Sequence, residues 1–152
     1  MTDINILSWN VRGLNSPIKR TRCLEFLHRK RVSIALIQET HLTATNVHRF
    51  QNKHYKIIAD SCASTKARGV LIIADRKLQF VVMEKGNDND GRFAYILLSI
   101  NYAKLLLASI YAPNVFDKTF LPSISVTLSR YLDPHCIIAG DYNAIVSRPQ
   151  CN

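Results

Sequence analysis

The stretch from Leu78 to Tyr111 decides the fold, and it reads LQFVVMEKGNDNDGRFAYILLSINYAKLLLASIY. Its three apolar runs are Leu78–Glu84, Phe93–Ile100 and Lys104–Tyr111, and they are rich in the aliphatic and aromatic residues typical of β-strands. The polar segment Lys85–Gly91 separates the first two runs, and Asn101–Ala103 separates the second from the third. Short polar turns between apolar runs predict an antiparallel meander.

The rest of the chain mixes further strands with two helices. Strands are predicted at Ile4–Trp9, Ser33–Gln38, Tyr55–Asp60, Gly69–Ala74 and His135–Gly140. Ser16-Pro17 predicts the start of a helix whose apolar face carries Ile18, Cys23, Phe26 and Leu27. Phe116, Phe120, Ile124, Leu128 and Leu132 follow at four-residue steps, and Pro122 places the start of that regular helix near Leu121. The sequence therefore predicts one α+β domain over residues 1–152.

The chain is strongly basic. It has 20 Lys and Arg residues against 11 Asp and Glu residues, and its formal net charge is +9. Such a field attracts a polyanion such as nucleic acid, although an anionic membrane surface or an acidic protein would also be attracted. The charge alone therefore names no partner.

Neither a membrane span nor a zinc site is expected. The longest apolar run is Phe93–Leu98, far below the roughly 18 residues of a membrane-spanning helix. The N-terminus lacks the pattern of a secretory signal, so we expect an intracellular protein, nuclear or cytoplasmic, with no membrane partner. Cys23, Cys62, Cys136 and Cys151 lie at wide, irregular spacings, which favours reduced structural thiols over zinc ligands.

Polar side chains follow directly on four apolar strands. They are Asn10, Glu39, Tyr111, Asp141 and Asn143, and Gly140 before Asp141 would let a ligand or a neighbouring backbone approach closely. If these strands end at the same rim of the sheets, two carboxylates, two amides and a phenol converge there. Oxygen ligands of this kind suit Mg²⁺. Taken singly, Glu39 and Asp141 are more simply explained as caps at strand ends, and their joint recurrence favours a site.

At this point the motifs resemble a known superfamily. The four stretches are Ser8–Pro17, Gln38–Leu42, Ile110–Asn114 and Gly140–Asn143, and in order and spacing they resemble the endonuclease/exonuclease/phosphatase superfamily. The wordings Leu-Asn-Ser-Pro and Gln-Glu-Thr-His-Leu resemble the apurinic-type endonuclease domain of LINE (non-LTR) retrotransposons. The resemblance implies a four-layer α/β-sandwich of the deoxyribonuclease/apurinic endonuclease type.

The resemblance also implies a role for each residue that matches a motif. Glu39 would be the principal Mg²⁺ ligand, with Asn10 assisting, and Mn²⁺ is a possible substitute. Tyr111 would contact the scissile phosphate, Asp141 would orient or deprotonate the attacking water, and Asn143 would hydrogen-bond the phosphate or that water. The implied substrate is DNA, nicked to leave a 3′ hydroxyl from which the reverse transcriptase domain of a full-length element would prime.

Two departures from the family pattern limit this interpretation. Arg12 occupies a position that is acidic in DNA-repair relatives, which agrees with the retrotransposon branch. The family fold continues to a Ser-Asp-His ending, and none of the five histidines of this chain lies in such a motif. We therefore expect an incomplete domain that lacks its C-terminal part and the catalytic Asp-His pair, with little or no cleavage activity.

Other functions and residues stay open. A non-catalytic nucleic-acid-binding remnant, or a phosphatase acting on a phosphorylated small molecule or lipid, would also fit, and the oligomeric state is not predicted. His41 is expected to be a structural donor beside Glu39, and Asn114 a helix N-cap before a substrate contact. Trp9 and Phe93 are expected in the core, and Arg68 and Arg92 near a phosphate. The basic residues Lys19, Arg20, Arg22, Arg29, Lys30 and Arg31 are expected either to bind DNA phosphate or to form a solvated helix face.

Overall fold

The computed structural model describes residues 3–131 and 135–143, which form two sheets and two α-helices. The elements in chain order are β1 (Ile6–Asn10), α1 (Pro17–Arg29), β2 (Ile34–Gln38), a short 3-10 helix η1 (Val47–Arg49), β3 (Tyr55–Ser61), β4 (Val70–Asp75), β5 (Val81–Asn87), β6 (Phe93–Ile100), β7 (Ala103–Tyr111), α2 (Phe120–Leu128) and β8 (His135–Asp141). All eight predicted strands are present, and β6 has the predicted bounds.

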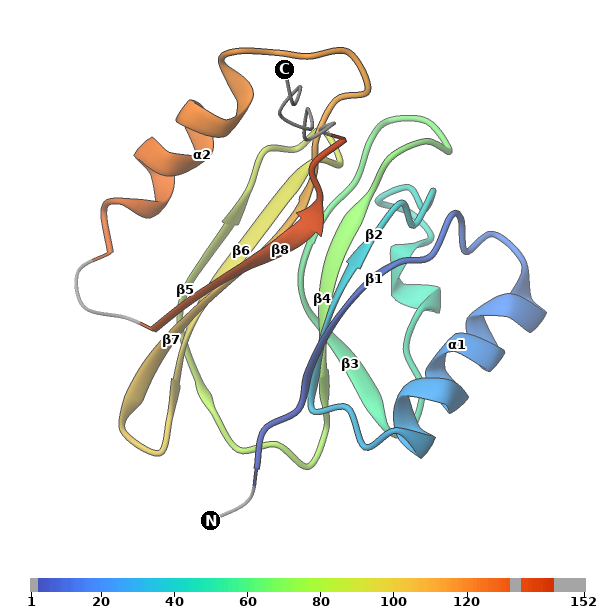
Figure 1. Ribbon diagram of the computed structural model, residues 1–152. Coiled ribbons are helices and arrows are strands. Elements are labelled where there is room, and N and C mark those ends of the chain that lie inside the picture. The colour runs from blue at the N-terminus through green and yellow to red at the C-terminus, as the bar shows by residue number, and fades with distance from the viewer. Residues whose placement is uncertain (1–2, 132–134, 144–152) are drawn as a thin grey trace, which may run out of the picture.

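Each sheet has four strands and mixes parallel with antiparallel pairs. The first has the order β1-β2-β4-β3, in which β1 and β2 are parallel. The second has the order β5-β6-β7-β8, in which the predicted meander β5-β6-β7 is antiparallel and β8 is parallel to β7. As a result β1, β2, β7 and β8 all end in the same direction in space, as Figure 1 shows.

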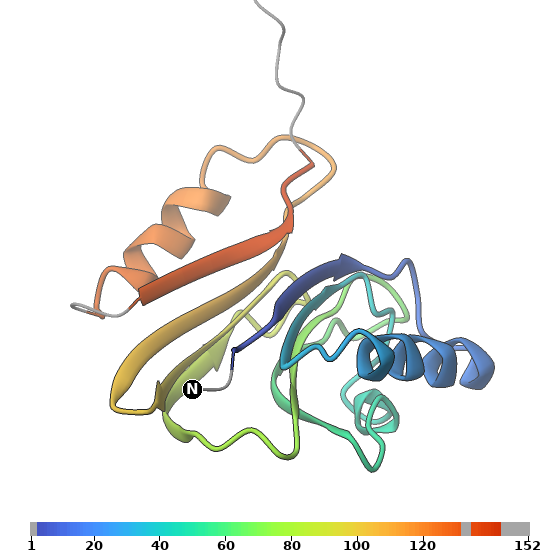
Figure 2. The same cartoon turned by 60° about the horizontal axis from the view of Figure 1, so that its bottom comes forward.

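Three apolar clusters separate the helices and sheets into four layers (Figure 2). Leu24 and Leu27 of α1 pack on one face of the first sheet, and Ile124 and Leu128 of α2 pack on the outer face of the second. The third cluster fills the space between the two sheets. β2 contributes to two clusters, because alternate side chains of a strand point to opposite faces. This explains why β2 is apolar from Ile34 to Ile37 instead of alternating.

The start of α1 follows the prediction, and one residue of its apolar face does not. Ser16 is the N-cap, its hydroxyl accepts a hydrogen bond from the Lys19 N–H, and Pro17 occupies the first turn. Cys23 is buried as expected, but Ile18 is 67% exposed. The buried residues of α1 are Cys23, Leu24 and Leu27, so Leu24 and not Ile18 belongs to the buried face.

Three further predictions are corrected by the structure. Strand β5 begins at Val81 and not at Leu78, and it runs on to Asn87 because its backbone pairs with β6 there. Phe116 lies outside α2 and is 90% exposed, so the apolar helical spacing does not extend back to it. Asn114 is not a helix cap, because Thr119 occupies the N-cap position of α2.

The remaining expectations concern the core, the membrane and the cysteines. Phe93 is buried, and Trp9 packs partly buried against Phe26, with ring centroids 5.2 Å apart. Within residues 3–131 and 135–143, no helix is long and apolar enough to cross a membrane. Cys23, Cys62 and Cys136 are free thiols, and Leu132 and Cys151 lie outside the described residues.

Candidate active site

Four strands bring their polar ends to one rim of the molecule. Asn10 pairs in parallel register with Gln38, which immediately precedes Glu39. Tyr111 pairs in parallel register with Asp141 on the other sheet. The two sheets pack face to face, so the ends of β1 and β2 lie beside the ends of β7 and β8 (Figure 1). The five predicted site residues therefore meet although up to 133 positions separate them along the chain, from Asn10 to Asn143.

The first pair at this rim is Asn10 with Asp141. The Asn10 side-chain amide donates to the Asp141 carboxylate, with a nitrogen-to-oxygen distance of 3.0 Å. The side-chain oxygen of Asn10 (Oδ1) accepts a hydrogen bond from the backbone N–H of Arg12 at 3.1 Å, and this contact fixes the orientation of the Asn10 side-chain amide. Gly140 holds Asp141 close to β7, because a Cβ at that position would lie 1.9 Å from the carbonyl oxygen of Ile110. The close approach is thus made by a neighbouring backbone.

The second pair is Glu39 with Tyr111. The Tyr111 hydroxyl donates to the Glu39 carboxylate at 2.8 Å. Burial, then the hydrogen bond to Glu39, and then the charges of Glu39 and Asp141 raise the pKa of Tyr111, while Arg92 lowers it. The hydroxyl therefore stays protonated at neutral pH and acts as a donor. Two carboxylates from different sheets act on the same phenol, which places them in one site.

Asn143 completes the rim from the segment after β8. Its N–H donates to the Asp141 carboxylate at 3.0 Å, and its side-chain amide donates to the backbone carbonyl of Ala112 at 2.6 Å. The amide nitrogen of Asn143 is thus engaged with the backbone after β7. Its side-chain carbonyl accepts no hydrogen bond within the described residues and remains available to a ligand.

An open cleft of about 710 Å³ lies against these residues. Its walls are formed by Ser8, Asn10, Gln38, Asn114, Gly140, Asp141, Tyr142 and Asn143. Asn10, Asp141 and Asn143 face the cleft directly, and the pair of Glu39 and Tyr111 lies beside its wall. Asn114, which is no helix cap, lies here at the cleft instead.

The backbone at the rim holds unusual conformations. Arg12, Glu39, His41 and Asn143 all have positive φ angles, between 45° and 57°. Such conformations cost on the order of 1–3 kcal/mol each for residues other than glycine, and they persist where the surrounding structure enforces them. Gly13 lies among them with φ of 95°, and its N–H donates to the Glu39 carbonyl at 2.6 Å. Positive φ angles also occur elsewhere, at Arg31, Asn101 and Tyr102, so this backbone conformation accompanies the rim and does not by itself identify it.

Sequence reasoning missed a buried polar cluster directly below the cleft. The Gln38 side chain is 2% exposed, and its amide donates to Ser8 at 3.3 Å and to Ser109 at 3.1 Å. The Ser109 hydroxyl in turn donates to the Ile37 carbonyl at 3.1 Å. The cluster ties the two sheets together below the rim. In the sequence, the signal for this cluster is that Ser8, Gln38 and Ser109 each stand as a polar residue near the end of an apolar strand.

The two arginines expected near a phosphate differ in their surroundings. Arg68 forms an ion pair with Asp90 at 2.7 Å and also donates to the Asp90 carbonyl at 2.8 Å, so it braces two loops. Arg92 lies over the Tyr111 ring, 5.6 Å from its centroid, and donates to the Tyr111 carbonyl at 3.3 Å. Arg92 is therefore the cation beside the site. His41 packs against Gly13, and its carbonyl accepts from Asn15.

The donor atoms at the rim fit a hard cation. Glu39, Asp141 and Asn10 offer carboxylate and amide oxygens, which Mg²⁺ prefers, usually with one or two carboxylates and several waters. One Glu39 oxygen accepts from Tyr111, and the other accepts no hydrogen bond within the described residues. Within residues 3–131 and 135–143, no group of three or more His, Cys, Asp and Glu side chains gathers.

Solved structures share this fold. The endonuclease domain of TRAS1, a telomere-specific non-LTR retrotransposon, superposes with a TM-score of 0.71 at 14% identity, covering 95% of this chain and 61% of that one. The AP endonuclease from Leishmania major superposes with a TM-score of 0.66 at 20% identity, covering 91% of this chain and 54% of that one. TDP2 from D. rerio, complexed with a single-strand DNA product, superposes with a TM-score of 0.70 at 19% identity, covering 94% of this chain and 62% of that one. The chain thus spans a little over half the length of these structures.

The sequence pattern of one family covers nearly the whole chain. It is the Endonuclease/Exonuclease/phosphatase family, and it matches residues 7–151. The match includes all four motifs and every residue of the rim described above. The two-sheet α+β fold agrees with it. The chain belongs to the endonuclease/exonuclease/phosphatase family.

Proposed function

We propose that this chain is the DNA-nicking, Mg²⁺-dependent endonuclease domain of a LINE-type retrotransposon. The observation that carries the proposal is that two contacts, Tyr111 to Glu39 and Asn10 to Asp141, lie together at one rim, where Tyr111 is the register partner of Asp141. Membership of the family supports phosphodiester chemistry. The Leu-Asn-Ser-Pro and Gln-Glu-Thr-His-Leu wordings and the fold of the TRAS1 domain support the retrotransposon branch.

Each rim residue has a defined part in this proposal. Glu39 and Asn10 hold the Mg²⁺, whose chemistry is Lewis-acid stabilisation of the charge on the phosphoryl oxygens. Tyr111 donates its hydroxyl hydrogen to a phosphate oxygen when the phosphate competes with Glu39 for it. Asp141 accepts from two donors that fix its carboxylate, and it orients or deprotonates the attacking water. Arg92 adds positive charge behind the Tyr111 ring.

The basic charge of the chain supports a polyanionic substrate. The formal net charge of +9 raises the local concentration of nucleic acid and accelerates encounter. Relatives in the family act on several kinds of phosphate ester, so DNA is the substrate we propose from the motifs and the charge together. In a longer polypeptide, a reverse transcriptase domain would use the 3′ hydroxyl left by the nick.

A nicking assay on supercoiled plasmid tests this function. The 152-residue sequence holds no Ser-Asp-His string, so we expect this polypeptide to nick DNA at least about a hundredfold more slowly than a longer family endonuclease that has one. The residual nicking should require Mg²⁺ and should disappear with Glu39→Ala. Glu84→Gln on β5, an exposed residue away from the rim, removes the same charge and should leave it unchanged.

The alternatives give different outcomes in the same experiments. Magnesium-independent retardation of DNA on a gel with no nicking would support a non-catalytic nucleic-acid-binding module. Release of phosphate from inositol phosphates, without nicking, would support a phosphatase. Nicking that survives Glu39→Ala would contradict the proposed site, whatever the substrate.

A further inference from the structure

A second basic feature lies away from the cleft, in a groove beside α1. The groove measures about 940 Å³. One wall is α1, which contributes Arg22, His28 and Arg29, and the other is the segment before β3, which contributes Lys53 and His54. The proposed catalytic function uses none of these five residues.

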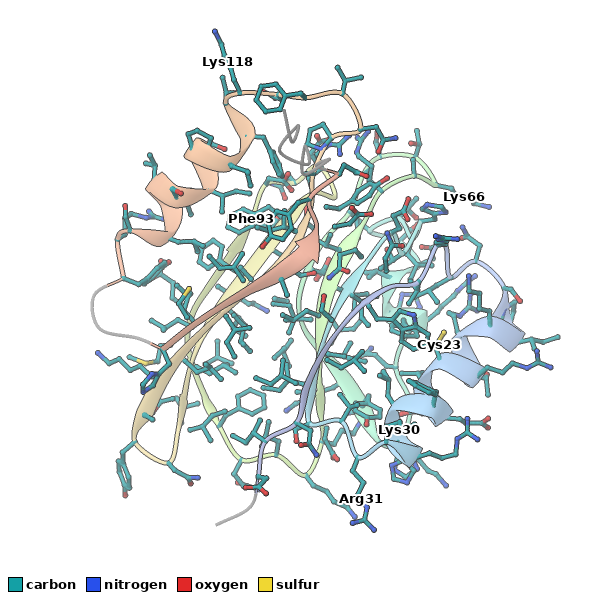
Figure 3. All side chains as sticks on the ribbon, in the orientation of Figure 1. Cys23, Lys30, Arg31, Lys66, Phe93 and Lys118 are labelled. Atoms are coloured by element: carbon teal, nitrogen blue, oxygen red, sulfur yellow. The ribbon has the colours of Figure 1, made fainter. Side chains whose placement is uncertain are left out.

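The groove lies at the end of the first sheet opposite the catalytic rim. Tyr55, which follows the groove segment, pairs with Asp75, whereas the other end of β3 pairs Ser61 with Val70 near the rim. A 13-residue helix spans roughly 20 Å, and α1 runs away from the rim. Figure 3 shows Lys30 and Arg31 at the far end of α1, away from the end of β8.

Hydrogen bonds hold the second wall in place. The Asn52 side chain accepts from the N–H groups of His54 and Tyr55, at 2.8 and 2.9 Å, and closes a tight turn. From the other side, Arg76 donates its Nε to the Asn52 carbonyl and its backbone N–H to the His54 carbonyl, both at 2.8 Å. The His54 ring consequently stacks on His28, with centroids 3.7 Å apart and planes 12° from parallel. The groove is thus preformed.

Within the described residues, no carboxylate forms an ion pair with the cations of the groove. Arg22 and Arg29 lie seven residues apart on the face of α1 opposite the buried Leu24, so packing does not explain them. In the part of the chain that the structure describes, Arg22, Arg29 and Lys53 form neither an ion pair nor a side-chain hydrogen bond. Glu25 is the one carboxylate among the lining residues. The positive charges repel one another, and a bound anion would relieve that repulsion.

From this geometry we propose that the groove binds the phosphate backbone of nucleic acid, without reading its sequence, as a site separate from the catalytic cleft. Arginine and lysine side chains and imidazole N–H groups are donors that match phosphate oxygens. The groove is lined by charged and polar side chains. Ile18, exposed one turn before Arg22 on α1, is a single aliphatic residue, less than the apolar face by which a helix inserts into a bilayer.

His54 supplies a local probe of the groove. Burial, then the charges of His28, Lys53 and Lys77, lower the pKa of His54, and Asp75 acts in the opposite direction. A phosphate placed in the groove would favour the charged imidazole and would raise the pKa of His54.

Duplex binding measured without divalent cation tests the site. The probe is a fluorescein-labelled DNA duplex of mixed sequence in EDTA, followed by anisotropy between about 50 and 200 mM salt. Arg22→Ala with Lys53→Ala removes one cation from each wall, and we expect a dissociation constant about tenfold higher and a salt slope smaller by about 2. Lys85→Ala with Lys104→Ala, two exposed lysines of the second sheet, removes the same charge and should change both values little.

Further measurements make the outcome unambiguous. Arg22→Gln with Lys53→Gln should reproduce the loss with an unchanged circular dichroism spectrum, which excludes a folding defect. In the wild-type chain, the duplex should raise the pKa of His54 measured by NMR. Equal losses in both double variants, or a His54 pKa that the duplex does not move, would overturn the proposal. Groove-dependent binding of polyglutamate or anionic vesicles, but not of DNA, would also overturn it. The pKa of His54 reports on the groove and nicking reports on the rim, so failure of either proposal is seen separately.

Discussion

Replacing Glu39 with glutamine is expected to weaken Mn²⁺ binding to the rim by about a hundredfold, because it removes the principal anionic ligand of a hard cation. Mn²⁺ serves as a spectroscopic substitute for Mg²⁺. The glutamine carbonyl can still accept the Tyr111 hydroxyl, which lies 2.8 Å from the Glu39 carboxylate, so the variant isolates the charge from the hydrogen bond. Electron paramagnetic resonance of free Mn²⁺ measures the affinity directly.

The control for this variant is Glu25→Gln. Glu25 is exposed on α1 and lies outside the rim, and its replacement changes the net charge by the same amount. We expect the Mn²⁺ affinity of Glu25→Gln to match the wild-type value. If both variants lose affinity equally, the ion is attracted by the overall charge and Glu39 does not ligate it.

Gly140→Ala is expected to lower the free energy of unfolding by about 3 kcal/mol, at the upper end of the range for inserting a methyl group into a packed position. The added Cβ would lie 1.9 Å from the Ile110 carbonyl oxygen and 2.7 Å from the Ile110 carbonyl carbon, and both atoms belong to backbone that has little room to move. The parallel pairing of β7 with β8 must open, and Asp141 moves away from Tyr111, its register partner. Denaturant unfolding measures the loss of stability.

Ala139→Gly is the matched control for this strand. It changes backbone freedom at the neighbouring position without adding an atom, and its cost should stay within about 1 kcal/mol. Gly140→Ala should also weaken Mn²⁺ binding, because it displaces Asp141, whose carboxylate holds the side-chain amide of the proposed ligand Asn10, whereas Ala139→Gly should not. A Gly140→Ala protein as stable as the wild type would show that β8 does not hold Asp141 against β7 as described.

The fold was predictable wherever local patterns and long-range packing agree. Phe93–Ile100 forms β6 with the predicted bounds, because its apolar residues are buried between two neighbouring strands. The observed bounds of β5 lie three residues after the predicted ones. The strand is at a sheet edge, where Val81 and Met83 are exposed, so the apolar pattern does not fix its register. Phe116 was misplaced because helical spacing continues past the point at which the backbone leaves the helix.

The sequence predicted which residues form the site, but it did not predict the hydrogen bonds that join them. Asn10 and Asp141 each follow an apolar strand, which the sequence displays, but their hydrogen bond joins residues 131 positions apart. The buried amide of Gln38 joins Ser8 and Ser109 across the two sheets, and nothing in a single segment indicates that pairing. The positive φ of Glu39 is likewise imposed by its neighbours, since glutamate does not favour it.

The most direct measurement of the central idea is a crystal structure with Mn²⁺, located by anomalous scattering. We expect one strong peak at the rim, within about 2.0–2.4 Å of a Glu39 carboxylate oxygen, with Asn10 and Asp141 around it and water completing the coordination. A peak that lies elsewhere while the rim stays metal-free at saturating Mn²⁺ would contradict the idea that these side chains assemble to hold the catalytic ion.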